Sequence, residues 1–428
     1  MKTKKIIIAT YGFPPYLKSL GGSIRILKLA DYLISRGHDV TVVCAQTPHL
    51  DSFGYDNLLS KIKTIPCEDP VASLAKRIRV ARTTAGSSGS GAKERLKHRL
   101  KTIVLDAMVP DTGVLVVRSM LEVVRREVDS ADEPVTLITS GPPHSVHLVG
   151  SKLKRTHPRV NWIMDYRDSW NGTSLFRKRT PLLQRLNASF ERKCIRAADH
   201  LSYISSPMLP KAERIAGISL TSKATLISNG YDEALLQEVW QEPPHRRDDT
   251  GPLRIGYYGA LDHGPSSYRD PAIIFRALLK LPESAIQFIV HGPSVLEAGW
   301  AERLGFRLKD GGKLPHTDAI RSMFKMDALL LLHTREEGAD EVVTGKVFEY
   351  IATGLPIISI GPANMAVNAL LKQDPSFHWV DHRDEVGLVT LLQQLANGRT
   401  VQVRRPDDLI HSFSRTAQHE KFLKLISS

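Results

Sequence analysis

Short apolar runs alternate with helical patterns along almost the whole chain. Runs of strand length occur at residues 5–10, 39–44, 135–139, 161–166, 200–205 and 224–228, and again at 253–259, 285–290, 327–332 and 355–359. Between them lie amphipathic segments such as SIRILKLADYLISRG, in which Ile24, Leu27, Ala30 and Ile34 recur at helical spacing. Many of the strands are apolar on both faces, which is typical of a parallel sheet covered by helices on both sides. The pattern therefore predicts an α/β protein.

A polar stretch separates the two series of strands. Residues 237–252, QEVWQEPPHRRDDTGP, contain three prolines and no apolar period, which is typical of a linker. At 428 residues the chain is also too long for one ordinary domain. We expect two doubly wound, Rossmann-like domains that face each other across a cleft, at residues 1–236 and 253–404. The linker joins them, and residues 405–428 follow as a terminal helical segment.

Composition narrows the class of protein. Hydrophobic residues make up 42% of the chain and charged residues 24%, as in a globular protein. The three cysteines form no CxxC pair, so we expect neither a disulfide framework nor structural zinc. The apolar core of the first segment, IIIA, is too short for a signal peptide, and no run approaches the ~20 apolar residues of a membrane span. A cytoplasmic location is expected.

The net charge of +13 is concentrated in one segment. Residues 76–101 contain nine lysines and arginines and one glutamate. Apolar residues at helical spacing in 93–108 make part of this region an amphipathic basic helix that could lie on an anionic membrane. A solvated outer face is the alternative interpretation. Nucleic-acid binding is not expected, because no recognised module accompanies the charge.

The unusual residues follow the strands. In open α/β sheets, ligands bind beyond the carboxyl ends of the strands. Six loops at such positions carry them: YGFPPYLKSLGGSIR, SGPPHS and RDSWNG in the first series, and GALDHG with Gly259, HGPS with His291, and HTREEGADE in the second. A recurrence over six loops is stronger evidence for a site than any one motif.

A glycine pair precedes the first predicted helix. Gly21 and Gly22 permit close backbone approach, and we expect Ser23 to cap a helix whose free N–H groups could face a phosphate or sugar. The alternative is an ordinary glycine-rich turn. The segment is not the GxGxxG fingerprint, and the chain contains no GxxxxGK[ST] loop, which argues against a P-loop ATPase.

Two loops of the first half offer acid–base and stacking groups. DYRDSW is a candidate acceptor-binding loop, in which Arg167 could bind the acceptor, Asp168 could hold an acceptor hydroxyl or take its proton, and Trp170 could present a flat face to a sugar ring. His144, in SGPPHS, is a second possible base. The alternative for the first loop is a structural corner in which Arg167 pairs with the acids on either side of it.

Lys346 occupies an unfavourable place for a cation. The sequence predicts a helix from Gly345, capped by Thr344 and ended by Gly354, with Lys346 in its first turn. A cation there interacts unfavourably with the helix dipole, which destabilises the helix by ~0.3–1 kcal/mol. A bound diphosphate would make this position favourable for a cation, because the helix N–H groups, Thr344 and Lys346 would face one anion. A solvated face with mixed charges is the alternative.

Two acids flank this lysine. Glu349 lies about one turn further along the same face, where a carboxylate could accept hydrogen bonds from ribose hydroxyls. Glu341 lies just before the helix and could reach a sugar beyond the phosphates.

Taken together, these segments resemble retaining GT-B glycosyltransferases of family four (group one) over nearly the full chain. The motifs are YGFPPYLKSLGGSIRILKLADYLISRGHDVTVV, ITSGPPHSVHLVG with WIMDYRDSW, LISNGYD, and EVVTGKVFEYIATGLPII. The motifs ITSGPPHSVHLVG and WIMDYRDSW are similar to those of a subgroup of bacterial surface-polysaccharide transferases. The resemblance implies a GT-B fold whose amino domain binds an acceptor, including a lipid-diphosphate-linked glycan, and whose carboxyl domain binds a nucleotide-sugar donor, with UDP favoured. The terminal helix would pack back on the amino domain.

The resemblance also implies roles for particular residues. Glu349 would hold the ribose, Glu341 the donor sugar and Lys346 the diphosphate, while Gly22 would approach the donor. Retaining transfer would need no metal or other cofactor, because Lys346 and helix amides would stabilise the leaving diphosphate. One departure is that the family's Arg/Lys loop reads GALDHGPSSYRDP here, without a lysine and with Arg269 late. Whether Arg269 or His291 supplies the second cation stays open.

Two other functions are compatible with these residues. An inverting transferase or a nucleotide-sugar epimerase would use the same fold, and inversion would need a true base such as Asp168 or His144. A non-catalytic glycan-binding or nucleotide-binding subunit is the third possibility, and the presence of Glu341, Lys346 and Glu349 argues against it.

Overall fold

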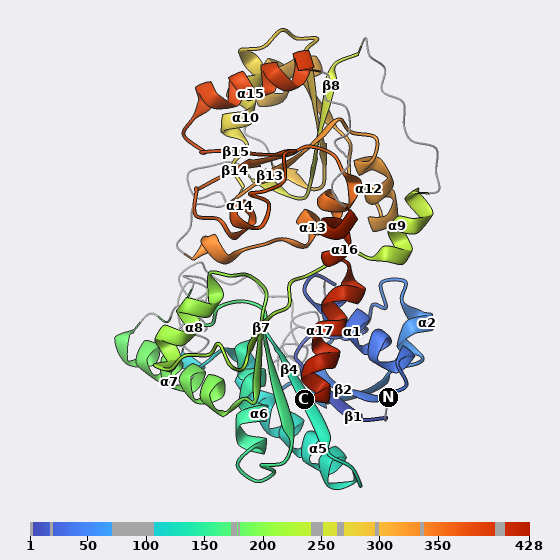
Figure 1. Ribbon diagram of the computed structural model, residues 1–428, viewed down its shortest axis with the longest axis vertical. Helices are drawn as coiled ribbons and strands as arrows, with labels where there is room; N and C mark the ends of the chain where they lie inside the picture. Colours follow the sequence, from blue (N-terminus) through green and yellow to red (C-terminus); the bar gives the residue numbers. More distant parts are fainter. Residues whose placement is uncertain are drawn as a thin grey trace, which may run out of the picture. The chain divides into compact units, whose positions relative to one another are not determined.

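The computed structural model describes residues 3–17, 20–70, 107–172, 178, 180–240, 251–262, 269–295, 299–333, 338–398 and 407–428. The chain forms two compact units, one of Met1–Ile227 with His419–Ser428 and one of Ser228–Gln418 (Figure 1). The basic segment 76–101 and residues 241–250 of the expected linker lie outside the described residues.

A seven-stranded parallel sheet forms the centre of the first unit, in the order β3-β2-β1-β4-β5-β6-β7. Its strands are β1 Lys5–Thr10, β2 Asp39–Gln46, β3 Lys63–Glu68, β4 Val135–Gly141, β5 Asn161–Tyr166, β6 His200–Tyr203 and β7 Ala224–Leu226. Ile6 of β1 pairs with Val40 on one side and Thr136 on the other. The carboxyl ends of these strands therefore meet at one edge.

Helices cover both faces of this sheet. One core contains Ile6, Ile8 and residues of α1 and α17, and the other contains Ile7, Ala9 and residues of α5, α6, α7 and α8. The alternation of Ile6, Ile7 and Ile8 between two cores explains why β1 is apolar on both faces. The helices are α1 Ser23–Ser35, α2 Asp56–Leu59, α5 Val117–Asp129, α6 His147–Leu153, α7 Pro181–Ala197, α8 Met208–Ala216 and α17 Arg415–Ser427, with 3₁₀ turns η1 Thr112–Leu115 and η2 His144–Val146.

The second unit has a six-stranded parallel sheet in the order β12-β10-β8-β13-β14-β15. Its strands are β8 Leu253–Tyr258, β10 Ile286–His291, β12 Leu308–Asp310, β13 Ala328–Leu332, β14 Ile357–Ile360 and β15 Phe377–Val380, with a separate pair of β9 Leu261–Asp262 and β11 Ser294–Val295. The edge formed by the ends of β8, β10 and β13 carries the loops singled out in the sequence.

Helices also lie on both faces of the second sheet (Figure 1). One core contains residues of α10, α11 and α15, and the other contains residues of α9, α12, α13 and α14. The elements are α9 Glu233–Trp240, α10 Ala272–Leu279, α11 Trp300–Leu304, η4 Gly305–Arg307, α12 His316–Met323, η5 Ala339–Glu341, α13 Gly345–Thr353, α14 Ala366–Leu370, α15 Glu385–Gly398 and α16 Asp407–Ser412.

The predicted fold class is confirmed, and each strand-length run that the sequence singled out contains a strand. β3, β12 and β15 were not predicted, and all three are edge strands. The compact units change at 227/228 and 418/419. α9 occupies 233–240, so the first residues of the expected linker are helical. Within α17, the residues from His419 onward belong to the first unit.

Two general features of the chain can be read from the described residues. Cys44, Cys67 and Cys194 are free and buried. None of the described helices combines the length and apolar character that crossing a bilayer requires.

Candidate functional site

Lys346 reaches the carboxyl edge of the second sheet from the start of α13. Its Nζ donates to the Tyr258 carbonyl at 2.9 Å and lies 4.1 Å from the centre of the Tyr257 ring. Both contacts are at the end of β8. The helix begins at Gly345 after Thr344 and ends at Gly354, which has a φ of 73°, as the sequence predicted. The side chain of Thr344 makes no capping bond, and its buried Oγ1 has no hydrogen-bond partner among the described residues.

A second cation lies beside Lys346. A Cβ placed on Gly259 would lie 3.2 Å from Lys346 Nζ and 3.8 Å from Arg269 Nη1, so both cationic groups approach the same point. Burial lowers the pKa of Lys346 to about 7, the charge of Arg269 adds to this effect, and Glu349 opposes it. Burial, Lys346 and Arg269 together lower the pKa of His333 to about 4. A group of basic side chains with depressed pKa values is a typical setting for an anion.

The loops after β8 and β10 meet at two glycines. Gly259 and Gly292 have φ values of 147° and 148°, and a Cβ on Gly292 would lie 2.4 Å from the Gly259 carbonyl oxygen. The Gly259 N–H donates to the His291 carbonyl at 2.8 Å. Only residues without a side chain fit this crossing. Because Gly259 and Gly292 carry no side chains, a ligand could approach their main chain closely beside Lys346.

The acids predicted for the donor site lie on or next to α13. Glu349 is 15% exposed and its Oε1 lies 2.7 Å from Nε2 of His316, the first residue of α12. This hydrogen bond raises the pKa of His316, while burial opposes the shift. Glu341 is buried at the end of η5, directly before the helix.

His291 is part of the packed structure at the same edge. Its Nδ1 lies 3.0 Å from the Gly311 carbonyl, which can only accept, so Nδ1 carries the proton. Its Nε2 then accepts from Ser322 Oγ at 3.1 Å, and Ser322 accepts from the Tyr258 hydroxyl at 2.8 Å. The ring also stacks on Tyr258 with 5.0 Å between centroids. Both ring nitrogens are therefore engaged within the protein.

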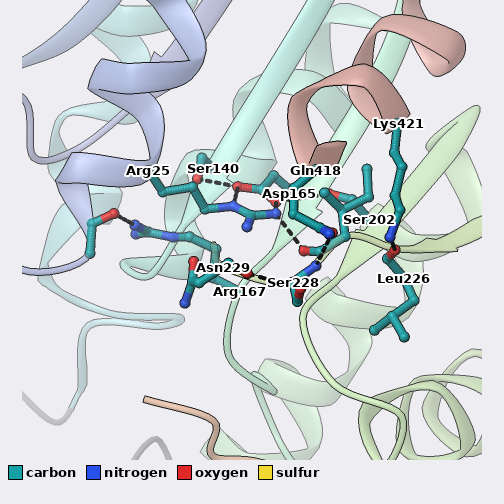
Figure 2. Close-up of polar contacts among 12 residues, drawn as sticks. Arg25, Ser140, Asp165, Arg167, Ser202, Leu226, Ser228, Asn229, Gln418 and Lys421 are labelled. Carbon is teal, nitrogen blue, oxygen red and sulfur yellow. Dashed lines mark hydrogen bonds and ion pairs between the residues drawn. The ribbon is translucent and has the colours of Figure 1, made fainter. Parts of the chain in front are cut away.

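The carboxyl edge of the first sheet is organised around a buried carboxylate, Asp165 (Figure 2). Asp165 accepts hydrogen bonds from Arg25 Nη2 at 3.1 Å, Ser140 Oγ at 2.7 Å and Ser202 Oγ at 2.8 Å. Burial alone would raise the pKa of Asp165, but Arg25, Arg167 and the hydrogen bonds lower it. Arg25 also donates to the Ile227 carbonyl at 2.8 Å. This cluster is a buried, hydrogen-bonded structural core in which the lowered pKa favours the ionised form of Asp165.

The glycine pair lies at the start of α1, with one correction. The N-cap is Gly22, not Ser23, and Ser23 Oγ instead donates to the Gly12 carbonyl at 2.9 Å. Gly21 has a φ of 22°. The Gly22 carbonyl accepts a hydrogen bond from Arg167. Ser23 therefore bonds to the preceding loop at Gly12 and does not cap α1 as the sequence predicted.

His144 and Trp170 are packed against each other in the interior. Their rings stack with 5.1 Å between centroids, and each side chain is 1% exposed. Trp170 Nε1 donates to Asn187 Oδ1 at 2.7 Å, which ties the loop to α7. Burial, His147 and Arg167 lower the pKa of His144 well below its usual value, which makes it a weak base. Asp168, next in sequence to Arg167, is only partly buried.

Sequence reasoning left Arg269 and His291 as alternatives for the second cation, and it did not consider His316 or His333. Arg269 stands just before α10, and His333 directly follows β13. The position of His333 was a usable signal, since it opens one of the six loops. The approach of Arg269 to Lys346 depends on how residues 259–269 return to the sheet, which no local pattern specifies.

The two parallel sheets with helices on both faces define a GT-B architecture, and solved structures share it. Sucrose-phosphate synthase from Thermosynechococcus elongatus superimposes with a TM-score of 0.61 and 15% identity over 99% of this chain and 98% of that one. Trehalose 6-phosphate synthase from Burkholderia multivorans gives 0.59 and 10% over 100% and 98%. A variant of S. aureus TarM in complex with fondaparinux, α-GlcNAc-glycerol and UDP gives 0.60 and 10% over 100% of both chains.

The sequence itself adds the biochemical class. Residues 21–230 match the family model described as "Glycosyl transferase 4-like domain". The chain is thus a transferase enzyme of the glycosyltransferase class with a GT-B fold. No curated protein matches the sequence.

Proposed function

We propose that the protein transfers a sugar from a nucleotide-sugar donor, with UDP-sugars favoured, to a hydroxyl group of a glycan or a lipid-linked acceptor. The observation that carries this proposal is the convergence of Lys346 and Arg269 beside Gly259, at the carboxyl edge of the second sheet and the first turn of α13. Two cations and helix N–H groups match the charge of a diphosphate. The pKa of Lys346, lowered to about 7, would rise again when an anion replaced the lost solvation.

The donor roles follow from the neighbours of Lys346. Glu349 binds the ribose hydroxyls and Glu341 the hydroxyls of the transferred sugar. Thr344 supplies its buried hydroxyl to a phosphate oxygen, which would satisfy a group that has no hydrogen-bond partner among the described residues. Gly21 and Gly22 approach the donor. Because side-chain cations and amides neutralise the leaving diphosphate, the reaction proceeds without a metal.

On the acceptor side, we assign the direct contact to Asp168. His144 and Trp170 are 1% exposed, so either could meet the acceptor only after the loop opened. The lowered pKa of His144 argues against its use as the general base of an inverting reaction. Of the two bases that an inverting reaction could use, this leaves Asp168 alone, and we propose transfer with retention of configuration.

The cellular setting is the synthesis of a bacterial surface polysaccharide at the inner face of the cytoplasmic membrane. The basic segment 76–101 binds the anionic membrane surface and brings the enzyme to a lipid-diphosphate-linked acceptor. Binding of the purified chain to vesicles with and without anionic lipid tests this part. Equal binding to both would contradict it.

The proposed reaction is tested with a panel of nucleoside diphosphates and their sugars, read by thermal unfolding. A cognate ligand at about 100 times its dissociation constant should stabilise the chain by about 2.7 kcal/mol. The donor that stabilises most is then incubated with hydroxyl acceptors, and the anomeric proton coupling of the product is measured. An inverted product would contradict retention, and a panel without any stabilising ligand would contradict the donor site.

A further inference from the structure

Arg167 directs its guanidinium group at three main-chain carbonyls. Its Nε donates to Gly141 at 3.0 Å, its Nη2 to Pro142 at 2.9 Å, and its Nη1 to Gly22. All three nitrogens are thus engaged with the backbone. A side chain held in this way cannot turn toward a substrate without giving up these bonds.

The carbonyls belong to segments that are distant in sequence. Gly22 is the N-cap of α1, whereas Gly141 ends β4 and Pro142 opens the turn that leads to η2. A Cβ on Gly22 would lie 2.8 Å from Arg167 Nη1, so the close approach depends on glycine. Arg167 itself follows β5. One side chain therefore ties together the loops after three neighbouring strands of the first sheet.

The chemistry of this contact requires arginine. A planar guanidinium presents N–H donors on three nitrogens in fixed, diverging directions, while a lysine ammonium carries its three donors on one atom and reaches only carbonyls that converge on that atom, as Lys223 does with the carbonyls of Ile195, Arg196 and Ala198. The charge is supported in place, because Asp165 and Asp168 attract it and oppose the effect of burial on the pKa of Arg167. Hydrogen bonds from a charged donor are also stronger than those of a neutral turn contact.

We propose that Arg167 is a positioning residue of the transferase. It holds the Gly22 carbonyl and the 141–142 turn in register, and so fixes the substrate-facing loops of the first unit, without contacting the acceptor itself. This inference rests on the proposed function for its effect on catalysis. The structural part, the restraint on residues 20–27, stands without it.

The test compares the full-length wild-type chain with Arg167→Ala, Arg167→Gln and Arg167→Lys. The matched control is Arg192→Ala, because Arg192 also donates through Nε to a main-chain carbonyl, that of Ile215 at 2.9 Å, but on an exposed helix face. Three quantities are measured: amide hydrogen exchange of residues 20–27, the Kd for UDP, and kcat and KM for transfer.

Arg167→Ala should speed amide exchange in residues 20–27 and leave exchange around residues 253–262 unchanged. It should lower kcat by about 100-fold, the loss expected from a misplaced reacting geometry, and change the Kd for UDP far less, because the proposed diphosphate contacts of Lys346 and Arg269 belong to the second unit. Arg167→Lys should recover only part of kcat, because it restores charge without the fork. Arg167→Gln keeps the comparison open if the alanine variant does not fold. Arg192→Ala should resemble wild type in all three quantities.

Three results would overturn the proposal. Loss of kcat with unchanged exchange would make Arg167 a direct acceptor contact. Faster exchange with unchanged kcat would make it a stability element only. Full recovery by Arg167→Lys would show that charge alone matters. A wild-type chain that turns over no donor would contradict the proposed function instead, and the exchange data would then decide the restraint on their own.

Discussion

Two polar clusters lie at the carboxyl edges of the two parallel sheets, one around Asp165 and one around Lys346, and they handle buried charge in opposite ways. Asp165 is enclosed by Arg25, Ser140 and Ser202, and its pKa is lowered. Lys346 has Arg269 close by, and its pKa is lowered to about 7, which disfavours its charged form. The first cluster stabilises its own charges, and the second makes a cation less stable.

Whether a charged side chain has a full set of partners distinguishes a structural cluster from a candidate ligand site more clearly than the residue type does. A buried ion with a full set of partners gains nothing from a ligand, because its hydrogen bonds are already made. A buried cation beside another cation loses solvation without full compensation, and an anion can restore the balance. The same edge of an α/β sheet can therefore hold a hydrogen-bonded core in one unit and, in the other, the diphosphate site that we propose.

The largest effect is expected from Asp165→Asn. The change preserves shape but leaves Arg25 as a buried cation without its carboxylate, which should reduce the free energy of unfolding by about 3–5 kcal/mol. Urea unfolding measures this. Since the pKa of Asp165 is lowered in the folded state, the stabilisation in wild type is present above the unfolded carboxyl pKa and is lost as pH falls below it. The variant should lack this acid-dependent loss.

Asp129→Asn is the matched control for that experiment. Asp129 also accepts a hydrogen bond from a basic side chain, His157 at 2.9 Å, but it is 65% exposed. An exposed pair contributes no more than about 1 kcal/mol. If both variants lost the same free energy of unfolding, the Asp165 cluster would not be the structural core described here.

A smaller effect is expected from Lys346→Met, and it concerns ligand affinity. Loss of a charge-assisted hydrogen bond to a phosphate should cost about 1.5–3 kcal/mol, or roughly 10-fold to 150-fold in the Kd for UDP. Because an anion favours the protonated amine and the pKa is about 7 in the free protein, wild-type affinity should fall from pH 7 to pH 9. The variant should show no such fall. Isothermal titration calorimetry gives both quantities.

Lys280→Met serves as its control. Lys280 is 55% exposed, lies in the same unit and pairs with Glu385 at 2.6 Å. Its removal should leave the Kd for UDP and the pH dependence unchanged. An equal loss of affinity in both lysine variants would mean that general charge attraction, and not a site at Lys346, binds the nucleotide.

Sequence patterns predicted the fold to a large extent because most strands are buried on both faces. The strands KIIIAT and ALLLL lie inside their sheets, and the apolar runs IIIA and ALLLL themselves mark the strands. The missed strands of the two large sheets, KTIPCE, LKD and FHWV, are edge strands that mix polar and apolar residues, and the missed pair of β9 and β11 has only two residues in each strand. An edge strand is covered less completely, and its sequence is correspondingly ambiguous.

The candidate site was predictable only where one local segment carried it. EVVTGKVFEYIATG encodes the helix, its ends and the misplaced cation Lys346 within one stretch. Contacts across the fold were not visible in this way: Arg269 beside Lys346, Arg25 on Asp165, and Arg167 on Gly22 each join distant segments. Such pairings depend on sheet order and loop return, for which a single sequence has no periodic signal.

The smallest effect is expected at the pair of His316 and Glu349. This prediction compares a partly exposed pair at the edge of the second cluster with Lys346 at its centre. The hydrogen bond from Glu349 raises the pKa of His316 in the folded state. The resulting stabilisation is fully present below the unfolded histidine pKa of about 6.5 and is lost as pH rises through the folded value. His316 is 51% exposed, so the gain at low pH should be about 0.2–1 kcal/mol.

Urea unfolding at pH 6 and pH 8 of wild type, His316→Gln, Glu349→Gln and the double variant measures this stabilisation as a coupling energy. A coupling that does not shrink from pH 6 to pH 8 would show that a neutral hydrogen bond, rather than a charged pair, joins the two side chains.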